Sequence, residues 1–162
     1  RVTVPAGIDE GEMLTLRGEG EPGRNGGPYG DLYVQIFIRP HPVFTREGNR
    51  TYCEVPITYA QAALGSEIEV PTIDGPVPYK LREGTQPGDM FTLRGKGIPY
   101  VGRPSARGDH FFRVSLEVPR NLSSHQKEML RAFDATCTDE NYEKRKSFFA
   151  KVRDAFGGSQ KR

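Results

Sequence analysis

An internal repeat constrains the fold of this chain more than any other feature of its sequence. Residues 7–22 and 84–99 are identical at nine of sixteen aligned positions, at a constant offset of 77. One additional residue then moves the offset to 78, so that Gly30-Asp31 aligns with Gly108-Asp109. Such self-similarity predicts two related subdomains in tandem. The identical pairs are Gly7/Gly84, Gly11/Gly88, Met13/Met90, Thr15/Thr92, Leu16/Leu93, Arg17/Arg94, Gly18/Gly95, Gly20/Gly97 and Pro22/Pro99.

Each repeat has the pattern of a turn, a strand, a glycine-rich loop and a second strand, which predicts a mainly β fold. The 19 Gly and 13 Pro among 162 residues are typical of short strands joined by turns. No run of 18 apolar residues occurs, so we expect no membrane span. We expect one or two helical turns at Thr58–Leu64 and strands at Val2–Val4, Met13–Leu16, Leu32–Ile38, Tyr52–Ile57, Glu67–Val70, Val77–Leu81, Met90–Leu93 and His110–Val118.

The segment Leu32–Ile38 has apolar side chains on both faces, because Leu32, Val34 and Ile36 share one face and Tyr33 and Phe37 the other. A strand of this kind is either covered on both sides or keeps one face for a ligand. The equivalent strand His110–Val118 alternates an apolar face with a polar one, so we expect one side of it to face water.

Helices are expected only near the end of the chain. Ser123 and Gln126 have the spacing of a capping box, and Met129, Leu130 and Phe133 of the following helix are expected to face inward. A second apolar stripe lies within residues 142–156 and is expected to stop at Gly157-Gly158. Its members are Phe148, Phe149, Val152 and Phe156. No β unit follows to cover them, so we expect a homodimer contact here; the alternative is that the stripe folds back on Phe133 or on a strand edge.

The residues show no pattern of an enzyme or of a nucleotide-binding protein. Pro22 and Pro99 follow the Gly-x-Gly loops, where a dinucleotide-binding fingerprint requires a helix. Asp31 and Asp109 are equivalent carboxylates, and paired carboxylates can perform acid–base chemistry. Each of them follows a Gly in a separate repeat, however, so we interpret both as turn-forming residues.

Metal and nucleic-acid sites are not expected either. Cys53 and Cys137 lack the Cys-x-x-Cys spacing of a zinc site. The formal net charge of +2 divides into +5 on residues 141–162 and −3 on the rest, whereas nucleic-acid-binding domains are usually basic on their folded body. A carbohydrate- or nucleic-acid-binding β module without catalysis stays as the alternative, although Trp is absent.

Several motifs resemble the carboxy-terminal domains of the DnaJ (J-domain protein) family, of bacterial type. The resemblance is specific from the first residue to about Leu130 and weaker at the end of the chain, over residues 146–156. It rests on Val4-Pro5-Ala6-Gly7-Ile8-Asp9-Glu10-Gly11, Gly30-Asp31-Leu32-Tyr33-Val34, His41-Pro42-Val43-Phe44-Thr45-Arg46-Glu47-Gly48-Asn49, Ala63-Leu64-Gly65-Ser66-Glu67-Ile68-Glu69-Val70-Pro71-Thr72-Ile73-Asp74-Gly75 and Leu93-Arg94-Gly95-Lys96-Gly97-Ile98-Pro99.

The resemblance implies two tandem β-sandwich-like subdomains followed by helices. It places the end of the first, peptide-binding β domain in residues 1–42, a second β domain in 43–120 and a helical dimerisation segment in 121–162. It also implies a peptide groove with Val34 in it. Val2 on a neighbouring strand, and Val4, Leu32 and Ile36 by strand parity, complete the expected groove; the alternative is that Val4 and Ile36 belong to the core.

The implied function is that of a cytoplasmic co-chaperone module, without enzymatic activity, that binds unfolded polypeptide and presents it to an Hsp70-class ATPase. The chain starts with Arg-Val-Thr-Val, shows no signal peptide and is expected to be a fragment. The family's His-Pro-Asp triad is absent, since His41-Pro42 is followed by Val43. The family's Cys-rich zinc repeats are absent as well. We therefore expect no cofactor in this chain and zinc in the full-length protein.

Overall fold

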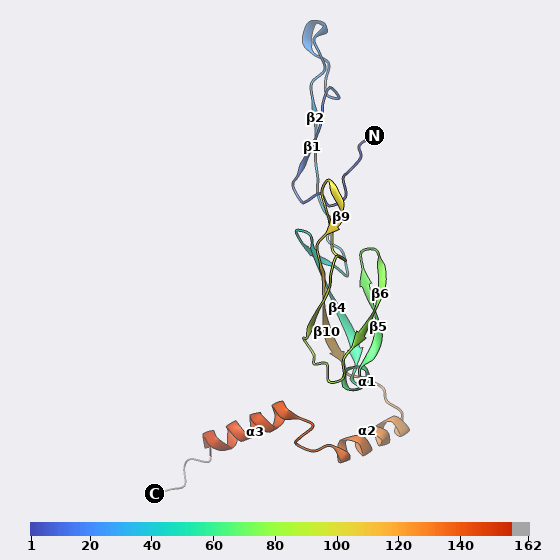
Figure 1. Ribbon diagram of the computed structural model, residues 1–162, viewed down its shortest axis with the longest axis vertical. Coiled ribbons are helices and arrows are strands. Elements are labelled where there is room, and N and C mark those ends of the chain that lie inside the picture. Colours follow the sequence, from blue (N-terminus) through green and yellow to red (C-terminus); the bar gives the residue numbers. More distant parts are fainter. Residues whose placement is uncertain (157–162) are drawn as a thin grey trace. The chain divides into compact units, whose positions relative to one another are not determined.

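The computed structural model describes residues 1–156 and consists of two compact units, which divide between Val118 and Pro119 (Figure 1). The first unit is mainly β, and the second is helical, which confirms the predicted fold class. The first unit contains the strands β1 (Met13–Leu16), β2 (Leu32–Gln35), β3 (Thr45–Glu47), β4 (Arg50–Thr58), β5 (Ser66–Thr72), β6 (Gly75–Leu81), β7 (Met90–Leu93), β8 (Pro99–Tyr100), β9 (Arg103–Arg107) and β10 (His110–Glu117), the 3-10 turn η1 (Arg24–Gly26) and the helix α1 (Tyr59–Leu64).

The largest sheet has the strand order β3-β4-β10-β7, and the pairs β1-β2, β5-β6 and β8-β9 form two-stranded sheets. β4 and β10 pair in parallel, and the other pairs are antiparallel. The core lies where inward side chains of β4 and β10 meet those of the hairpin β5-β6, in a sandwich-like arrangement. Phe112, Val114 and Val70 are fully buried there. Burial of each such side chain stabilises the fold by roughly 1.5–3 kcal/mol relative to exposure.

The structure confirms the internal repeat. In the first repeat Met13 pairs with Gln35 and Leu16 with Leu32, and in the second Met90 pairs with Arg113 and Leu93 with His110. The backbone hydrogen bonds beside these ladders also correspond, since the amide of Gly11 donates to Ile36 O (3.0 Å) and that of Gly88 to Val114 O (2.8 Å). The two hairpins therefore have the same register.

The aspartates of the repeat hold the turns at the end of these hairpins. Asp31 Oδ1 accepts a hydrogen bond from the Gly18 amide at 3.0 Å, and Asp109 Oδ1 accepts one from the Gly95 amide at 2.9 Å. Gly18 and Gly95 have φ of 70° and 67°, a left-handed conformation that favours glycine. These contacts confirm the interpretation of both aspartates as turn-forming residues.

A polar joint connects the first repeat to the second. The guanidinium of Arg46 in β3 donates to Ile8 O at 2.9 Å and to Gly7 O at 3.1 Å, and it lies 3.5 Å from the Asp9 carboxylate. Gly7 has φ of 93°, and a Cβ atom at this position would lie only 2.1 Å from the carbonyl oxygen of Pro99. The two repeats thus meet at a contact that requires glycine.

Some predicted elements differ from those of the structure. The strand expected at Val2–Val4 is wrong, since these residues have no regular secondary structure and no pairing partner among the described residues. The strand expected at Leu32–Ile38 ends at Gln35, which is paired with Met13, the first residue of its partner strand β1. Prediction also missed β3 and the hairpin β8-β9. The helical turns at α1 are confirmed, with Thr58 and Gln61 forming a capping box.

The second unit contains the helices α2 (Ser124–Thr136) and α3 (Glu143–Phe156). The predicted capping box at Ser123 and Gln126 is confirmed. The inward position expected for Met129, Leu130 and Phe133 is wrong within this chain, because all three side chains are exposed and no buried residue occurs in α2. The predicted stop at Gly157-Gly158 lies outside the described residues. None of the helices within residues 1–156 is long and apolar enough to cross a membrane.

Candidate functional site

Three of the five predicted groove residues lie on or beside β2, in the first repeat. Leu32 and Val34 pair with Leu16 and Leu14 of β1. Ile36 follows the end of β2, and its amide donates to Glu12 O at 2.9 Å. Leu32 is exposed, at 42%, whereas Val34 and Ile36 are half-buried. The structure therefore gathers a row of apolar side chains that the described residues cover only in part.

The other two predicted groove residues, Val2 and Val4, precede β1 in an irregular segment. Val4 is 53% exposed and Val2 is half-buried. The expected neighbouring strand is not formed, so these side chains have no strand parity with which to face a groove. A contact of Val2 or Val4 with polypeptide stays a prediction.

The equivalent side chains of the second repeat lie in the four-stranded sheet and are buried there. Leu32, Val34 and Ile36 correspond to His110, Phe112 and Val114 of β10, and these three are completely buried. Their cover comes from the hairpin β5-β6 and from the neighbouring strand β4. Within the described residues β2 pairs only with β1, so its apolar row has no comparable cover. The first repeat therefore presents an apolar row at the positions that the second repeat buries.

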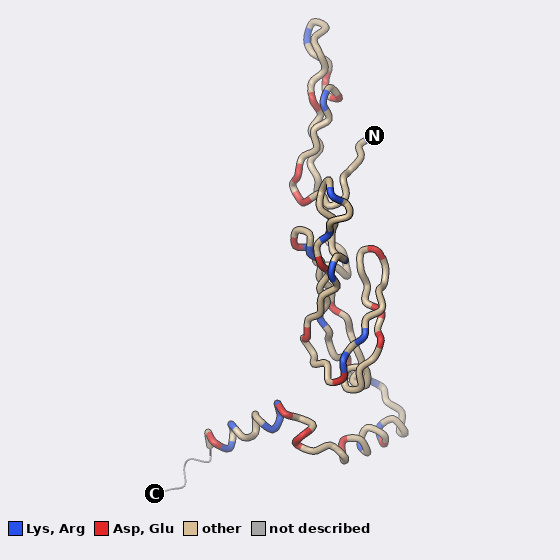
Figure 2. Tube along the Cα trace, viewed as in Figure 1, with Lys and Arg blue, Asp and Glu red and all other residues tan. Residues whose placement is uncertain are grey.

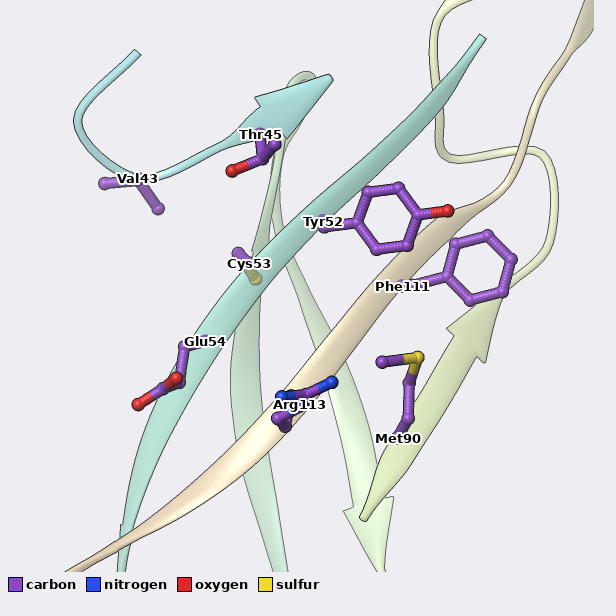
Figure 3. A pocket seen from close by; sticks show the side chains of 8 residues that line it. All are labelled: Val43, Thr45, Tyr52, Cys53, Glu54, Met90, Phe111 and Arg113. Carbon is purple, nitrogen blue, oxygen red and sulfur yellow. The ribbon is translucent and has the colours of Figure 1, made fainter. Parts of the chain in front are cut away.

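The opposite face of the large sheet contains a shallow pocket with a volume of about 370 Å³ (Figure 3). Tyr52 of β4 and Phe111 of β10 stack in it with ring centroids 5.2 Å apart, and Met90 of the edge strand β7 lies beside them. Glu54 and Arg113, which are register partners, add one charge of each sign. The remaining lining residues are Val43, Thr45 and Cys53.

Sequence reasoning did not single out this pocket, although a signal was present. Met13 and Met90 are identical positions of the repeat, and both side chains are exposed, at 59% and 49%. In each repeat, the strand that pairs with the one carrying Met has an aromatic residue on the same face of the sheet. This residue is Tyr33 in the first repeat and Phe111 in the second. A Met and an aromatic residue retained on an outward face of both copies form an adaptable apolar surface.

A buried polar cluster lies on the core side of the same strands. His110 Nδ1 is 2.8 Å from Thr51 Oγ1, and His110 Nε2 is 3.4 Å from Cys53 Sγ. Burial raises the pKa of the Cys53 thiol, and burial lowers the pKa of His110 while a hydrogen bond with the backbone of Thr51 opposes that change. An activated Cys–His pair requires a thiolate, so this arrangement is that of a neutral hydrogen-bonded core.

The described residues do not provide a metal centre. No group of three or more His, Cys, Asp or Glu side chains within residues 1–156 could hold a metal ion. Neither Cys53 nor Cys137 forms a disulfide, and the Cys53 thiol is hydrogen-bonded to His110. Zinc was expected in a Cys-rich part of the full-length protein and not at these residues, so that expectation stays a prediction.

The predicted dimerisation residues lie on α3. Phe148, Phe149 and Phe156 are 60%, 52% and 82% exposed, and Val152 is half-buried. The rings of Phe148 and Phe149 pack edge to face with centroids 5.4 Å apart. Lys and Arg residues are interspersed with them along α3 (Figure 2). The structure therefore leaves an apolar stripe on this helix without cover from the described residues of its unit.

Comparison with known proteins places this chain in a family. The model described as "DnaJ C terminal domain" matches residues 1–119, and the one described as "Chaperone protein DnaJ C-terminal region" matches residues 125–158. The chain belongs to the DnaJ C-terminal domain family. The resemblance inferred from the motifs is therefore confirmed.

Curated DnaJ relatives are similar to this chain over almost its whole length. The chaperone protein DnaJ of Ruminiclostridium cellulolyticum is 55% identical over 156 residues, which cover 96% of this chain and 41% of that protein. The DnaJ of Acetivibrio thermocellus is 55% identical over 157 residues, with 97% and 40% coverage. The DnaJ of Clostridioides difficile is 50% identical over 155 residues, with 96% and 40% coverage. The chain thus spans about two fifths of the length of these DnaJ proteins.

Proposed function

We propose that this chain is the polypeptide-binding part of a DnaJ-type co-chaperone, which holds non-native clients and presents them to an Hsp70-class ATPase. Membership of the DnaJ C-terminal domain family supports this role. The observation that carries it is the incompletely covered apolar row on β2, in particular exposed Leu32 beside Val34. An extended client segment can bind such a surface through apolar side chains and through main-chain hydrogen bonds at a strand edge.

The alternative of a carbohydrate- or nucleic-acid-binding module is not favoured. The named relatives are chaperones. The outer pocket also carries the carboxylate of Glu54 next to the guanidinium of Arg113, so it offers no basic surface for phosphates. We further expect a cytoplasmic location, and zinc only in a Cys-rich part of the full-length protein.

The central test replaces Val34 by a charged residue. We expect Val34→Asp to weaken the binding of a fluorescent unfolded peptide, since a carboxylate in an apolar surface must be desolvated by each client side chain. Fluorescence anisotropy measures the affinity and thermal unfolding measures the fold. Gln35→Asp, on the other face of β2, is the matched control and is expected to bind the peptide normally.

Two results would reject this placement of the site. Equal affinities of wild type and Val34→Asp would show that Val34 does not contact the client. A large fall in the melting temperature of Val34→Asp alone would show that Val34 belongs to the core. Light scattering of a denatured client provides the functional readout, and aggregation is expected to be suppressed without nucleotide hydrolysis.

We also propose that α3 mediates a homodimer, which would present two client surfaces on one particle and so raise avidity for a long unfolded chain. The support is the exposed stripe of Phe148, Phe149 and Phe156. A stripe of this size favours a weak interface, so the dimer is expected to depend on concentration. Sedimentation equilibrium of the chain is compared with that of a version truncated after Asp139. Identical masses for both across micromolar concentrations would contradict the proposal.

A further inference from the structure

The loop between β1 and β2 contains an Asn-Gly step in an exposed and open position. Asn25 has φ of 56° and ψ of 36°, and its side chain is exposed. Gly26 has φ of 78°, and a Cβ atom at this residue would meet nothing within 4 Å. The backbone on the carboxyl side of Asn25 is therefore unhindered both by a side chain and by its surroundings.

We propose that Asn25 is a site of spontaneous deamidation with water as the co-reactant. The backbone nitrogen of Gly26 attacks Cγ of Asn25, a C–N bond forms, and the side-chain amide leaves as ammonia with the proton of the Gly26 amide. Water then opens the five-membered imide at either carbonyl, and the products are aspartate and isoaspartate. The net change is one water consumed and one ammonia released, with no oxidant or reductant.

The other asparagines of the chain lack this combination of features. Asn49 donates from Nδ2 to Pro99 O at 2.8 Å and is followed by Arg50. Asn141 accepts at Oδ1 from the Thr138 amide at 2.8 Å and is followed by Tyr142.

Asn121 is the most informative comparison, because its φ of 56° equals that of Asn25. The residue that follows it is Leu122, whose side chain hinders attack by its own backbone nitrogen. The two asparagines share this φ and are both exposed but are followed by different residues, so Asn121 serves as an internal control.

The chemistry changes the loop without reaching the hairpin. Either product adds a carboxylate next to Arg24, and isoaspartate also adds one methylene group to the main chain. The hydrogen bond from the Gly27 amide to Arg24 O (3.2 Å) spans the modified residue and would be lost in isoaspartate. The cross-strand bonds of Gly20 with Gly30 and of Gly30 with Glu21 lie outside this turn, so β1 and β2 remain paired.

The test is peptide mapping by mass spectrometry of the whole chain during incubation at neutral and mildly alkaline pH. We expect deamidation at Asn25 to be several-fold faster than at Asn121, and to accelerate with pH because the attacking nitrogen must lose its proton. Hydroxylamine, which cleaves the cyclic imide, is expected to cut the chain between Asn25 and Gly26.

Two variants separate the mechanism from local unfolding. Asn25→Gln keeps Gly26 and is expected to abolish both the mass change and the hydroxylamine cut. Leu122→Gly gives Asn121 the same following residue and is expected to make it deamidate faster than in the wild type. Equal rates at Asn25 and Asn121 in the wild type, or no hydroxylamine cleavage after incubation, would overturn the proposal. Neither result bears on client binding, so this inference and the proposed function fail independently.

Discussion

His110 occupies, in the second repeat, the position that Leu32 occupies in the first. Its ring is completely buried and touches Thr51 Oγ1, Cys53 Sγ and the edge of Phe44, whose ring centroid is 5.8 Å away. A buried imidazole with such partners is stable as the neutral form, since burial of a charge without a counter-ion is costly. At the residue scale, the large sheet therefore contains an element of pH dependence that the first repeat lacks.

We predict that acid destabilises the β unit through His110. Burial lowers the pKa of His110 in the folded chain below its ordinary value of 6.5, so the unfolded chain binds this proton more readily. The stabilisation is thus complete above pH 6.5 and is lost as the pH falls toward the folded pKa. Urea unfolding across this range is expected to show a steeper loss of stability in wild type than in His110→Leu.

The same comparison contains its own control. His41 and His125 are present in both proteins, so any pH dependence that they cause cancels. His110→Leu leaves the Thr51 hydroxyl without its partner and is expected to lower stability at neutral pH. Parallel stability curves for the two proteins between neutral and acid pH would contradict the role of His110.

At the scale of elements, the sequence was most informative where residues recur. The recurrence of Met13/Met90 and Leu16/Leu93 predicted the bounds of two strands, and the repeated glycines and aspartates predicted the turns that follow them. Ser123 and Gln126 fixed the start of α2, because a capping box involves only local contacts. Features of this kind depend on a few neighbouring residues and are therefore readable without tertiary structure.

Elements that depend on distant partners were not predictable in the same way. Val2–Val4 has strand-forming residues but no pairing partner within residues 1–156, and Pro99–Tyr100 forms β8 because Arg103–Arg107 pairs with it. The pocket on the large sheet also depends on the parallel pairing of β4 with β10, which places Tyr52 next to Phe111. No sequence spacing predicts that contact. For the predicted groove, the sequence indicated the apolar row but not how much of it the other strands leave uncovered.

We predict that Ser123→Ala weakens α2. Ser123 accepts a hydrogen bond from the Gln126 amide at 3.2 Å, and its own amide donates to Gln126 Oε1 at 2.8 Å. Loss of an N-cap serine costs about 1 kcal/mol, which matters for a helix of 13 residues without buried side chains. Amide hydrogen exchange within α2 is expected to accelerate. Ser124→Ala, one residue later, is the control and is expected to leave exchange unchanged; similar exchange in both variants would contradict the cap.

At the scale of the whole molecule, the contact between the two repeats combines polar contacts with a buried apolar residue, Ile8, that is not part of the main core cluster. The joint consists mainly of Arg46 and backbone carbonyls, together with the close approach of Gly7 to Pro99. A guanidinium suits this position because its planar set of donors can reach several carbonyl oxygens at once. The joint is thus specific in geometry, although it is built from few contacts.

We predict that Arg46→Ala loosens residues 5–9 without unfolding the large sheet. The variant loses the hydrogen bonds to Gly7 and Ile8, each worth about 1.5–3 kcal/mol because the donor is charged. Limited proteolysis and hydrogen exchange are expected to show faster opening of residues 5–9 and unchanged protection of β10. Arg50→Ala, which removes a neighbouring exposed arginine, is the control. Unchanged protection of residues 5–9 in Arg46→Ala would show that the joint does not depend on this side chain.

The parallel pairing of β4 with β10 has a consequence for synthesis on the ribosome. Thr51 pairs with His110 and Thr58 with Glu117, so β4 must wait for a partner that follows it by about 60 residues in the chain. At translation rates of roughly 5–20 residues per second, β4 emerges about 3–12 s before β10 can join it. During that interval Val55 and Ile57, which are buried in the finished sheet, lack β10 and have only the residues that precede it to cover them. A chain that is proposed to bind unfolded segments of other proteins thus exposes apolar segments of its own while it is being synthesised.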